Sequence, residues 1–173
     1  MSLSYFELFG LNPLFNIELA ALESNYRKLQ SETHPDRFVT ASPAEKLNSM
    51  QQATLANEAY QTLKNPANRA KYLLELQGIT AISETNTAMS TDFLMQQMEW
   101  RETTEDAAAA KDIDALESLL GEIRIEAKSL QESLVKLLDV TKDYAAATDV
   151  TRKLIFIDKV SEDINHAIEQ LDI

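Results

Sequence analysis

Apolar residues recur along this chain at spacings of three and four, which places them on one face of a helix. Leu22, Tyr26 and Leu29 form such a stripe inside a predicted helix over residues 17–33. A second predicted helix, from residue 43 to about residue 64, carries a second apolar face: Leu47, Met50, Leu55, Ala59, Tyr60 and Leu63. The two stripes predict two antiparallel helices that are joined by a polar loop.

Proline and capping residues set the predicted helix ends. The residue before a proline is pushed out of the helical region, so Pro35 ends the helix over residues 17–33. The segment 42–45, Ser-Pro-Ala-Glu, has the pattern of an N-cap followed by a proline in the first turn and a glutamate that completes a capping box. Two short helices are predicted in addition, over residues 4–11 and about 66–76.

The C-terminal half predicts three longer helices, over residues 92–110, 112–144 and 148–171. A three-helix bundle is the simplest way to bury their apolar stripes. The last helix carries a coiled-coil-like seam with spacings of three and four: Val150, Leu154, Ile157, Val160, Ile164, Ile168 and Leu171.

Residues 78–91 separate the two halves and predict a linker, because they contain Ser, Thr, Asn and Gly, lack Lys and Arg and show weak periodicity. Only three glycines and four prolines are present in the whole chain, so the turn residues that many short strands need are missing. We therefore expect an all-α protein. An N-terminal domain of a helical hairpin plus short helices would cover residues 1–77, and a C-terminal three-helix bundle would cover residues 92–173.

The composition excludes several classes of site. Without cysteine the chain cannot form disulfides, thiolate zinc sites or a thiolate-held iron-sulfur cluster, and two histidines are too few for a multi-histidine metal cage. We expect no cofactor and no metal. No apolar run approaches the length that crosses a bilayer, and the N-terminus lacks a basic segment followed by an apolar one. A soluble, cytoplasmic protein is expected.

Charge is distributed unevenly along the chain. Residues 1–77 carry seven Lys and Arg against eight Asp and Glu, a net charge of −1. The remaining residues carry nine against twenty, a net charge of −11, which together with the first part gives −12. An acidic C-terminal half disfavours nucleic acid and anionic membrane as partners, and it favours a basic patch on a partner protein.

The tripeptide His34-Pro35-Asp36 lies between the two antiparallel helices. Pro35 could simply end a helix, and Asp36 could simply cap a turn. The flanking helices favour a functional interpretation, because a loop between two antiparallel helices can present a carboxylate and an imidazole on a rigid tip. Asp36 would then pair with an arginine of a partner, and His34 would orient the loop.

Helix, HPD loop and antiparallel helix together resemble the J-domain family, whose members stimulate ATP hydrolysis by DnaK-type chaperones. Residues 25–29 (NYRKL) and 57–63 (NEAYQTL) are also similar to segments of that family. The resemblance implies a surface that binds the ATPase chaperone. Its residues in this sequence would be His34, Pro35, Asp36, Arg27, Lys28 and Arg37.

The helix before the HPD loop departs from the family pattern. Glu23, Ser24 and Glu32 stand where J domains carry more lysine or arginine. Electrostatic steering to a generic DnaK should therefore be weak, which favours a dedicated ATPase partner.

A helical wheel of the segment 92–110, with ~100° per residue, places Phe93 and Trp100 on one face. The opposite face carries Leu94, Met95, Met98, Glu99, Glu102 and Asp106. Either these apolar residues form an exposed patch that binds a partner through methionine and carboxylate contacts, or they pack beneath the N-terminal domain. Phe156 lies off the seam of the last helix and is either a further binding residue or a core residue.

Further segments resemble the HscB family, the J-type co-chaperones of bacterial iron-sulfur cluster biogenesis. Residues 93–102 (FLMQQMEWRE) are similar to its scaffold-binding helix, and residues 5–11, 69–74 and 152–159 also match in place. The resemblance implies that the N-terminal domain stimulates the ATPase HscA and that the bundle binds the cluster scaffold IscU. The residues that contact the scaffold would be Leu94, Met95, Met98, Glu99, Glu102, Asp106 and Phe156.

Two other classes of function compete with this one. A general J-domain co-chaperone would deliver unfolded clients to DnaK, but the chain has no Gly/Phe-rich segment and no CxxCxGxG zinc repeat. An enzyme would need a paired acid and base, a phosphate loop or a metal constellation, and the sequence shows none of these. We therefore expect a non-enzymatic protein.

Overall fold

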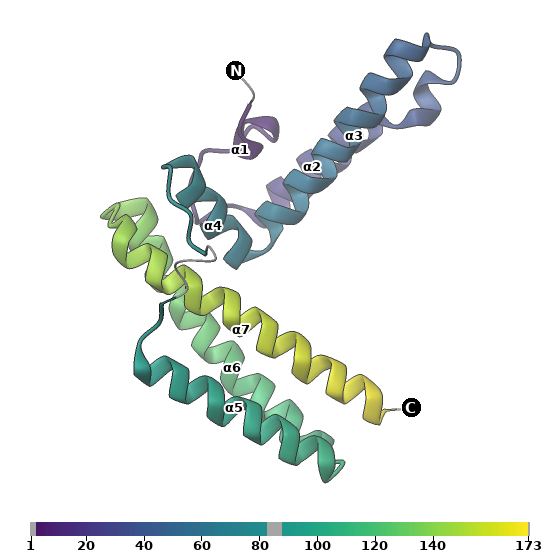
Figure 1. Ribbon diagram of the computed structural model, residues 1–173. Helices are drawn as coiled ribbons and strands as arrows, with labels where there is room; N and C mark the ends of the chain where they lie inside the picture. The colour runs from purple at the N-terminus through teal and green to yellow at the C-terminus, as the bar shows by residue number, and fades with distance from the viewer. Residues whose placement is uncertain (1–2, 83–87, 173) are drawn as a thin grey trace. The chain divides into compact units, whose positions relative to one another are not determined.

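The computed structural model describes residues 3–82 and 88–172, and every regular element within these ranges is a helix (Figure 1). The chain divides into two compact units, and the division falls between Leu73 and Leu74. The boundary predicted at residue 77 lies about one helical turn further along. Of the predicted linker, residues 83–87 lie outside the described residues. No helix in the described ranges is long and apolar enough to cross a membrane.

The first unit is built on a helical hairpin. Helices α2 and α3 pack against each other and are joined by a short 3-10 turn over Pro35–Phe38. Helix α3 has the predicted bounds, and the Ser42 hydroxyl accepts a hydrogen bond from the Glu45 amide at 3.3 Å, as expected of an N-cap. The helices of this part of the chain are α1 (Tyr5–Leu8), α2 (Leu19–Thr33), α3 (Pro43–Lys64) and α4 (Pro66–Leu76), the last of which crosses the division.

Aromatic stacking joins the elements of the first unit. The rings of Tyr26 on α2 and Tyr60 on α3 are stacked with centroids 4.1 Å apart, and Phe9 meets Tyr26 edge to face at 6.3 Å. Buried Arg69 donates hydrogen bonds of 2.7 Å to the carbonyl oxygens of Phe15 and Leu63. The loop before α2 is thereby tied to the end of α3.

The apolar face predicted for α3 is wrong in its first half. Leu47, Met50 and Leu55 are exposed, and the buried side chains of α3 are Ser49, Ala56, Ala59 and Leu63. Each spacing of three or four residues is close to one helical turn, but the angular deviations from a whole turn add up along the helix. At ~100° per residue, Leu47 and Leu63 end up on opposite sides of α3.

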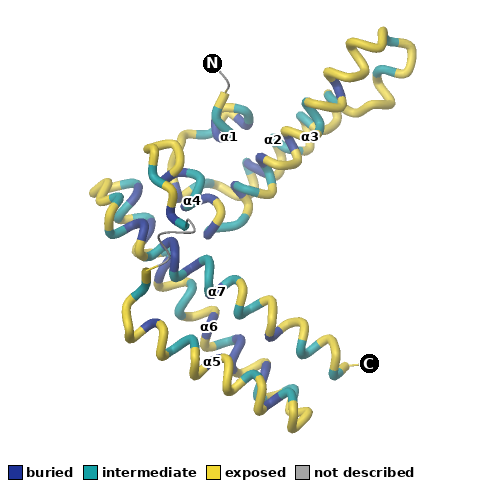
Figure 2. The backbone as a smooth tube through the Cα atoms, viewed as in Figure 1, coloured by how far each residue is buried: buried dark blue, intermediate teal, exposed yellow. Residues whose placement is uncertain are grey.

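The second unit is a three-helix bundle (Figures 1 and 2). Its helices are α5 (Thr91–Ala109), α6 (Ile113–Leu134), which continues into a π-helical turn over Val135–Val140, and α7 (Tyr144–Leu171). Helix α7 begins four residues before the predicted start at residue 148. Asp143 causes this early start, because its carboxylate caps the Ala146 amide at 3.2 Å.

The core of the bundle contains three of the seven residues of the predicted seam. Leu154, Ile157 and Ile164 of α7 are buried, whereas Val150, Val160, Ile168 and Leu171 are only half-buried. Opposite them lie buried residues of the other two helices: Phe93, Trp100 and Ala107 of α5, and Leu116, Leu119, Leu120, Ile123, Leu130 and Leu134 of α6.

Buried Arg152 ties the chain that enters the bundle to α7. Its guanidinium donates to the Ala81 carbonyl oxygen at 2.6 Å and to the Ala88 carbonyl oxygen at 3.4 Å. Asp149 lies 3.5 Å from the same group. A single charged side chain thus satisfies two carbonyls on either side of the undescribed stretch and positions the start of α5.

We predict that Arg152→Met destabilises the bundle by about 2–3 kcal/mol, because methionine keeps the apolar stem but leaves the buried Ala81 carbonyl without its charged donor. Trp100 is the one tryptophan of the chain and is buried in the bundle, so its fluorescence during urea unfolding reports on this unit. The matched control is Arg124→Met on the exposed side of α6, with a change below about 0.5 kcal/mol. Equal midpoints for the two variants would contradict the role given to Arg152.

Candidate functional site

The HPD tripeptide forms an exposed tip on the α2–α3 hairpin. His34 is the C-cap residue that follows α2, and its imidazole Nδ1 accepts a hydrogen bond from the Asp36 amide at 3.2 Å. The Arg37 amide donates to the His34 carbonyl at 3.0 Å. These bonds hold the 3-10 turn together, while the Asp36 side chain stays 89% exposed. The tip therefore presents a carboxylate on a fixed backbone.

The basic residues predicted to accompany the tip are all exposed, but they are not gathered at one point. Arg37 lies in the loop itself, whereas Arg27 and Lys28 lie on α2 about two turns before His34, which is roughly 10 Å along the helix axis. Arg27 also forms an ion pair with Glu23 at 2.6 Å. The cationic part of this surface is thus modest.

On helix α5, the N-cap fixes which residues enter the core. The Ser90 hydroxyl accepts a hydrogen bond from the Phe93 amide at 3.3 Å, and α5 begins at Thr91. Phe93 and Trp100 are 4% and 6% exposed and meet edge to face at 6.3 Å. Both aromatic residues therefore anchor α5 to the bundle, as the wheel predicts.

The opposite face of α5 is open to solvent. Leu94, Met95 and Met98 are 46%, 58% and 65% exposed, and the three carboxylates on this side are exposed as well. We call this surface the α5 patch: Leu94, Met95, Met98, Glu99, Glu102 and Asp106. Its exposure agrees with the interpretation as a surface patch rather than as a second core face.

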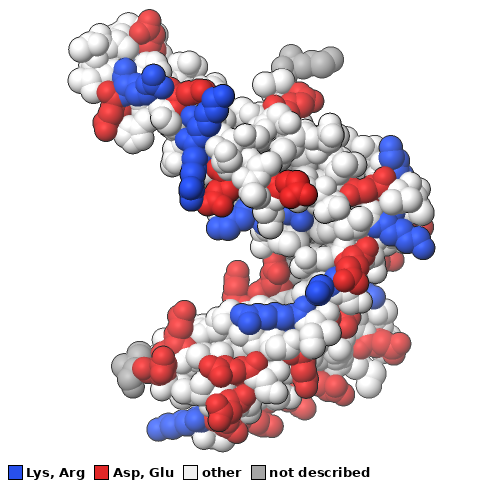
Figure 3. All heavy atoms as spheres, turned by 180° about the vertical axis from the view of Figure 1, so that it is seen from behind, with Lys and Arg blue, Asp and Glu red and all other residues white. Residues whose placement is uncertain are grey.

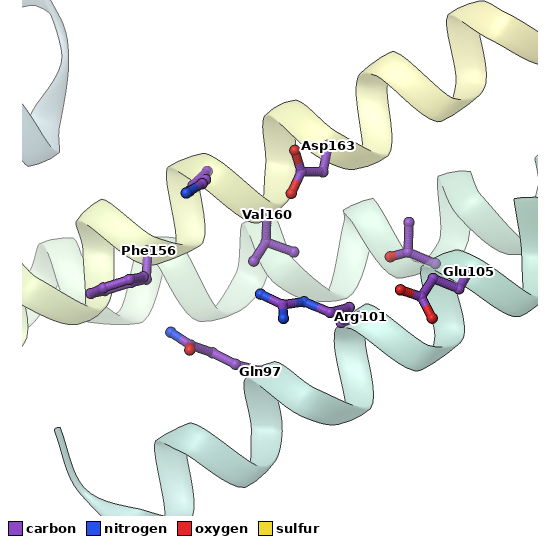
Figure 4. A pocket seen from close by; sticks show the side chains of 8 residues that line it. Gln97, Arg101, Glu105, Phe156, Val160 and Asp163 are labelled. Carbon is purple, nitrogen blue, oxygen red and sulfur yellow. The ribbon is translucent and has the colours of Figure 1, made fainter.

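Phe156, predicted to be either a binding residue or a core residue, is partly buried and lines a groove between α5 and α7 (Figure 4). The groove has a volume of about 290 Å³. Its walls include Gln97, Arg101 and Glu105 from α5, and Phe156, Val160 and Asp163 from α7.

The groove adjoins the α5 patch. At ~100° per residue, Gln97 and Arg101 lie roughly 40° and 80° round α5 from Phe93, and Leu94 lies roughly 100° round. Phe156 and Leu94 therefore stand on either side of the row that Gln97 and Arg101 form. Sequence analysis missed Gln97 and Arg101 as groove residues, although the same wheel contains the signal.

Carboxylates are spread over the visible face of the bundle, with few basic side chains among them (Figure 3). Within the described part of the chain, no three Asp, Glu or His residues gather closely enough to hold a metal ion. The site is thus an apolar and acidic protein surface without the geometry of a metal centre.

Comparison with known proteins identifies two family domains and relatives over nearly the full length. Residues 4–72 match the DnaJ domain, and residues 89–165 match the domain described as the HSCB C-terminal oligomerisation domain. The chain is 50% identical over 169 residues to the co-chaperone protein HscB homolog of Burkholderia multivorans. This match covers 98% of this chain and 96% of that protein.

Solved structures agree with this match. Chaperone HscB from Vibrio cholerae is 39% identical with a TM-score of 0.85, and the match covers 98% of this chain and 99% of that one. The human co-chaperone protein HscB is 28% identical with a TM-score of 0.89, covering 99% and 84% respectively.

The division of α5 into a core face and a solvent face predicts opposite effects of truncation. Phe93→Ala should destabilise the bundle by about 3–5 kcal/mol, because it removes a buried aromatic side chain. Leu94→Ala combined with Met98→Ala should change stability by less than about 1 kcal/mol, because both side chains are at the surface. Thermal unfolding followed by far-ultraviolet circular dichroism checks both. Should the double variant unfold as readily as Phe93→Ala, the α5 patch would belong to the core.

Proposed function

This chain belongs to the HscB family of co-chaperones, and we propose that it stimulates the ATPase of an HscA-type chaperone and delivers an IscU-type iron-sulfur scaffold to it. The observation that carries the proposal is the presence of two exposed surfaces on two compact units. The HPD tip belongs to the first unit, and the α5 patch belongs to the second.

The proposed division of labour follows the domains expected from the sequence. The J domain, residues 1–77, binds the ATPase chaperone, and the acidic bundle, residues 92–173, binds the scaffold. Residues 78–91 link them. The protein works by binding, without a resident cofactor and without catalytic residues of its own, in the cytoplasm.

At the ATPase surface, Asp36 is the central group. Its carboxylate is held out on a rigid turn, so it loses little conformational freedom when it pairs with an arginine of the chaperone. His34 acts by holding the geometry of the loop, because its imidazole accepts a hydrogen bond from the Asp36 amide. Arg27, Lys28 and Arg37 supply a modest positive field around the tip. With so little steering charge, a dedicated chaperone is a better partner than a generic one.

At the scaffold surface, apolar and acidic contacts have different tasks. Leu94, Met95 and Met98 provide apolar area on flexible side chains that adapt to a partner. The carboxylates Glu99, Glu102 and Asp106 at its rim select a basic surface and speed the encounter. Phe156, which is already partly buried, adds an aromatic contact from α7.

A second candidate is a general J-domain co-chaperone that hands unfolded clients to DnaK. The DnaJ domain match is compatible with it. The carboxylate rim of the α5 patch favours one partner with a matching basic surface, since charges around a binding surface reject partners whose charges do not match them. A pull-down that recovers many unfolded clients instead of the scaffold would support the second candidate.

We predict that Asp36→Ala abolishes stimulation of the HscA ATPase while the protein remains folded. The hydrogen bond that orients the loop uses the Asp36 backbone amide, so alanine preserves it. Steady-state ATP turnover and circular dichroism are measured together. The matched control is Glu32→Ala, which removes another exposed carboxylate at the end of α2 and should leave stimulation within about twofold, as expected of an exposed charge outside a contact. Full stimulation of the ATPase by a folded Asp36→Ala variant would contradict the assignment of the HPD tip as the surface that binds the ATPase chaperone.

We predict that Leu94→Ala combined with Met98→Ala weakens scaffold binding at least about tenfold, because truncation of central apolar contacts typically costs more than 1 kcal/mol each. Stimulation of the ATPase by the chain alone should be unchanged, since the HPD tip lies in the other unit. Ile125→Ala on α6, a change at another exposed apolar residue, is the matched control for calorimetric titration.

Salt should separate the two kinds of contact at this surface. Affinity should fall as salt screens the carboxylate rim and then level off, because the apolar contacts are not screened. Replacing Glu99, Glu102 and Asp106 by their amides should flatten this dependence and slow association more than it speeds dissociation. A parent affinity that is indifferent to salt would show that the carboxylates serve solubility alone.

A further inference from the structure

The groove between α5 and α7 differs in charge from the bundle around it. Helix α5 contains five carboxylates and one basic residue, Arg101. Arg101 lines the groove, and Lys159 of α7 lines it from the other side. Two cations thus face one cavity in a part of the chain whose net charge is −11 (nine basic against twenty acidic residues after residue 77).

The cationic and anionic groups of the groove are separated along its length. Figure 4 shows the Arg101 side chain pointing into the space between the helices, toward Gln97 and Phe156. Glu105 and Asp163 lie further along, each about one turn beyond Arg101 and Val160 on their own helices. One end of the groove is therefore aromatic and cationic, and the other end is anionic.

The cations of the groove have no internal counter-ion within ion-pair distance. Among the ion pairs that the described residues form, none includes Arg101 or Lys159. Glu105 stands four residues after Arg101, where a helix would allow a pair, yet the two are not within 4.0 Å. The guanidinium is thus available to an outside acceptor.

We propose that this groove is a second subsite of the scaffold-binding surface, which receives a carboxylate of the partner through Arg101 and an adjoining apolar side chain through Phe156 and Val160. The inference rests on the function proposed above and adds to it the chemistry of the partner. Arginine suits the task because its planar guanidinium donates two parallel hydrogen bonds to a carboxylate. Phe156 and Val160 beside it supply apolar area for the adjoining side chain of the partner.

The charge around the groove decides among possible occupants. A polyanion such as nucleic acid or an anionic membrane would be repelled by the surrounding carboxylates, and so would the equally acidic bundle of a second copy of the chain. One carboxylate on an otherwise neutral or basic protein surface meets no such repulsion. The occupant that the charges favour is therefore an acidic residue next to an apolar one on the scaffold.

Such a subsite would fix how the scaffold lies on the bundle. The α5 patch selects positive charge through Glu99, Glu102 and Asp106, whereas the groove selects a negative charge on its Phe156 side. Opposite preferences on neighbouring surfaces disfavour every placement of the partner but one. Arg101 is thus a specificity-determining residue, and its loss should affect the choice of partner orientation as well as affinity.

The test measures scaffold affinity for Arg101→Glu, Arg101→Lys and the control Arg124→Glu, which makes the same charge change on the exposed side of α6. We expect Arg101→Glu to weaken binding about tenfold or more and Arg124→Glu to match the parent. Arg101→Lys should weaken binding less than Arg101→Glu does, because the ammonium keeps the positive charge but cannot donate the two parallel hydrogen bonds. Trp100 fluorescence confirms that each bundle is folded, and Arg101→Gln serves in place of the reversed charge if that variant is unfolded.

A charge swap on the partner identifies the acceptor. Exposed Asp and Glu residues of the scaffold are changed one at a time to Lys, and each variant is titrated with the parent chain and with Arg101→Glu. One scaffold variant should bind the Arg101→Glu chain more tightly than the unchanged scaffold binds that same Arg101→Glu chain. Purely additive losses for every scaffold variant would overturn the inference.

The remaining outcomes separate this inference from the proposed function. Suppose that Arg101→Glu binds the scaffold as tightly as Arg124→Glu does, while the double variant Leu94→Ala/Met98→Ala loses binding. This result would overturn the groove subsite and leave the proposed function intact. Sedimentation of the chain without scaffold is run in parallel. A change of self-association in Arg101→Glu with unchanged scaffold affinity would assign the groove to a second copy and overturn the proposal. A parent chain that binds no scaffold would overturn both.

Discussion

The rotation of about 100° between successive residues of α5 is the constraint on which the binding surface depends. Phe93 and Trp100 are drawn into the bundle core, and the N-cap at Ser90 sets where that rotation begins. Once these residues are fixed, Leu94 and Met98 must face outward. Neighbouring exposed apolar side chains are typical of an interaction surface, which is the role that we propose for the α5 patch.

The same constraint explains why one helix can offer three kinds of chemistry. Moving round α5 from the core, the groove side carries Arg101, the next strip carries Leu94 and Met98, and the far side carries Glu99 and Glu102. Cation, apolar strip and carboxylates follow one another within one circumference. If a partner binds here as we propose, its surface must match all three in order, and this requirement would give specificity without a large area.

Much of the fold could be predicted from the sequence because local signals were strong. Proline and capping residues mark the ends of α3, and Phe93 and Trp100 follow the wheel. Predictions failed where tertiary packing decides the outcome. Leu47 and Met50 were expected in a core face of α3, but the buried side chains of this helix include the small Ser49 and Ala56 instead. Spacing alone cannot show on which side a neighbouring helix lies.

The site shows the same contrast between local and tertiary information. The HPD tip and the α5 patch lie within single segments, so sequence spacing was enough to propose them. The groove lies between α5 and α7, and Arg101 and Phe156 line it together only after the bundle forms. Arg152 also had no sequence signal as a structural residue, because its acceptors at Ala81 and Ala88 lie more than sixty positions away.

The central claim is that one chain must carry both surfaces, so that the ATPase chaperone and the scaffold are brought together. The most direct measurement is HscA turnover in the presence of scaffold with an equimolar mixture of two full-length variants, Asp36→Ala and Leu94→Ala/Met98→Ala. Each variant keeps one surface and lacks the other. The account predicts that the mixture reaches no more than the sum of the two separate activities, well below the parent protein. Turnover restored to the parent level by the mixture would contradict it, because the two surfaces would then not need to be joined.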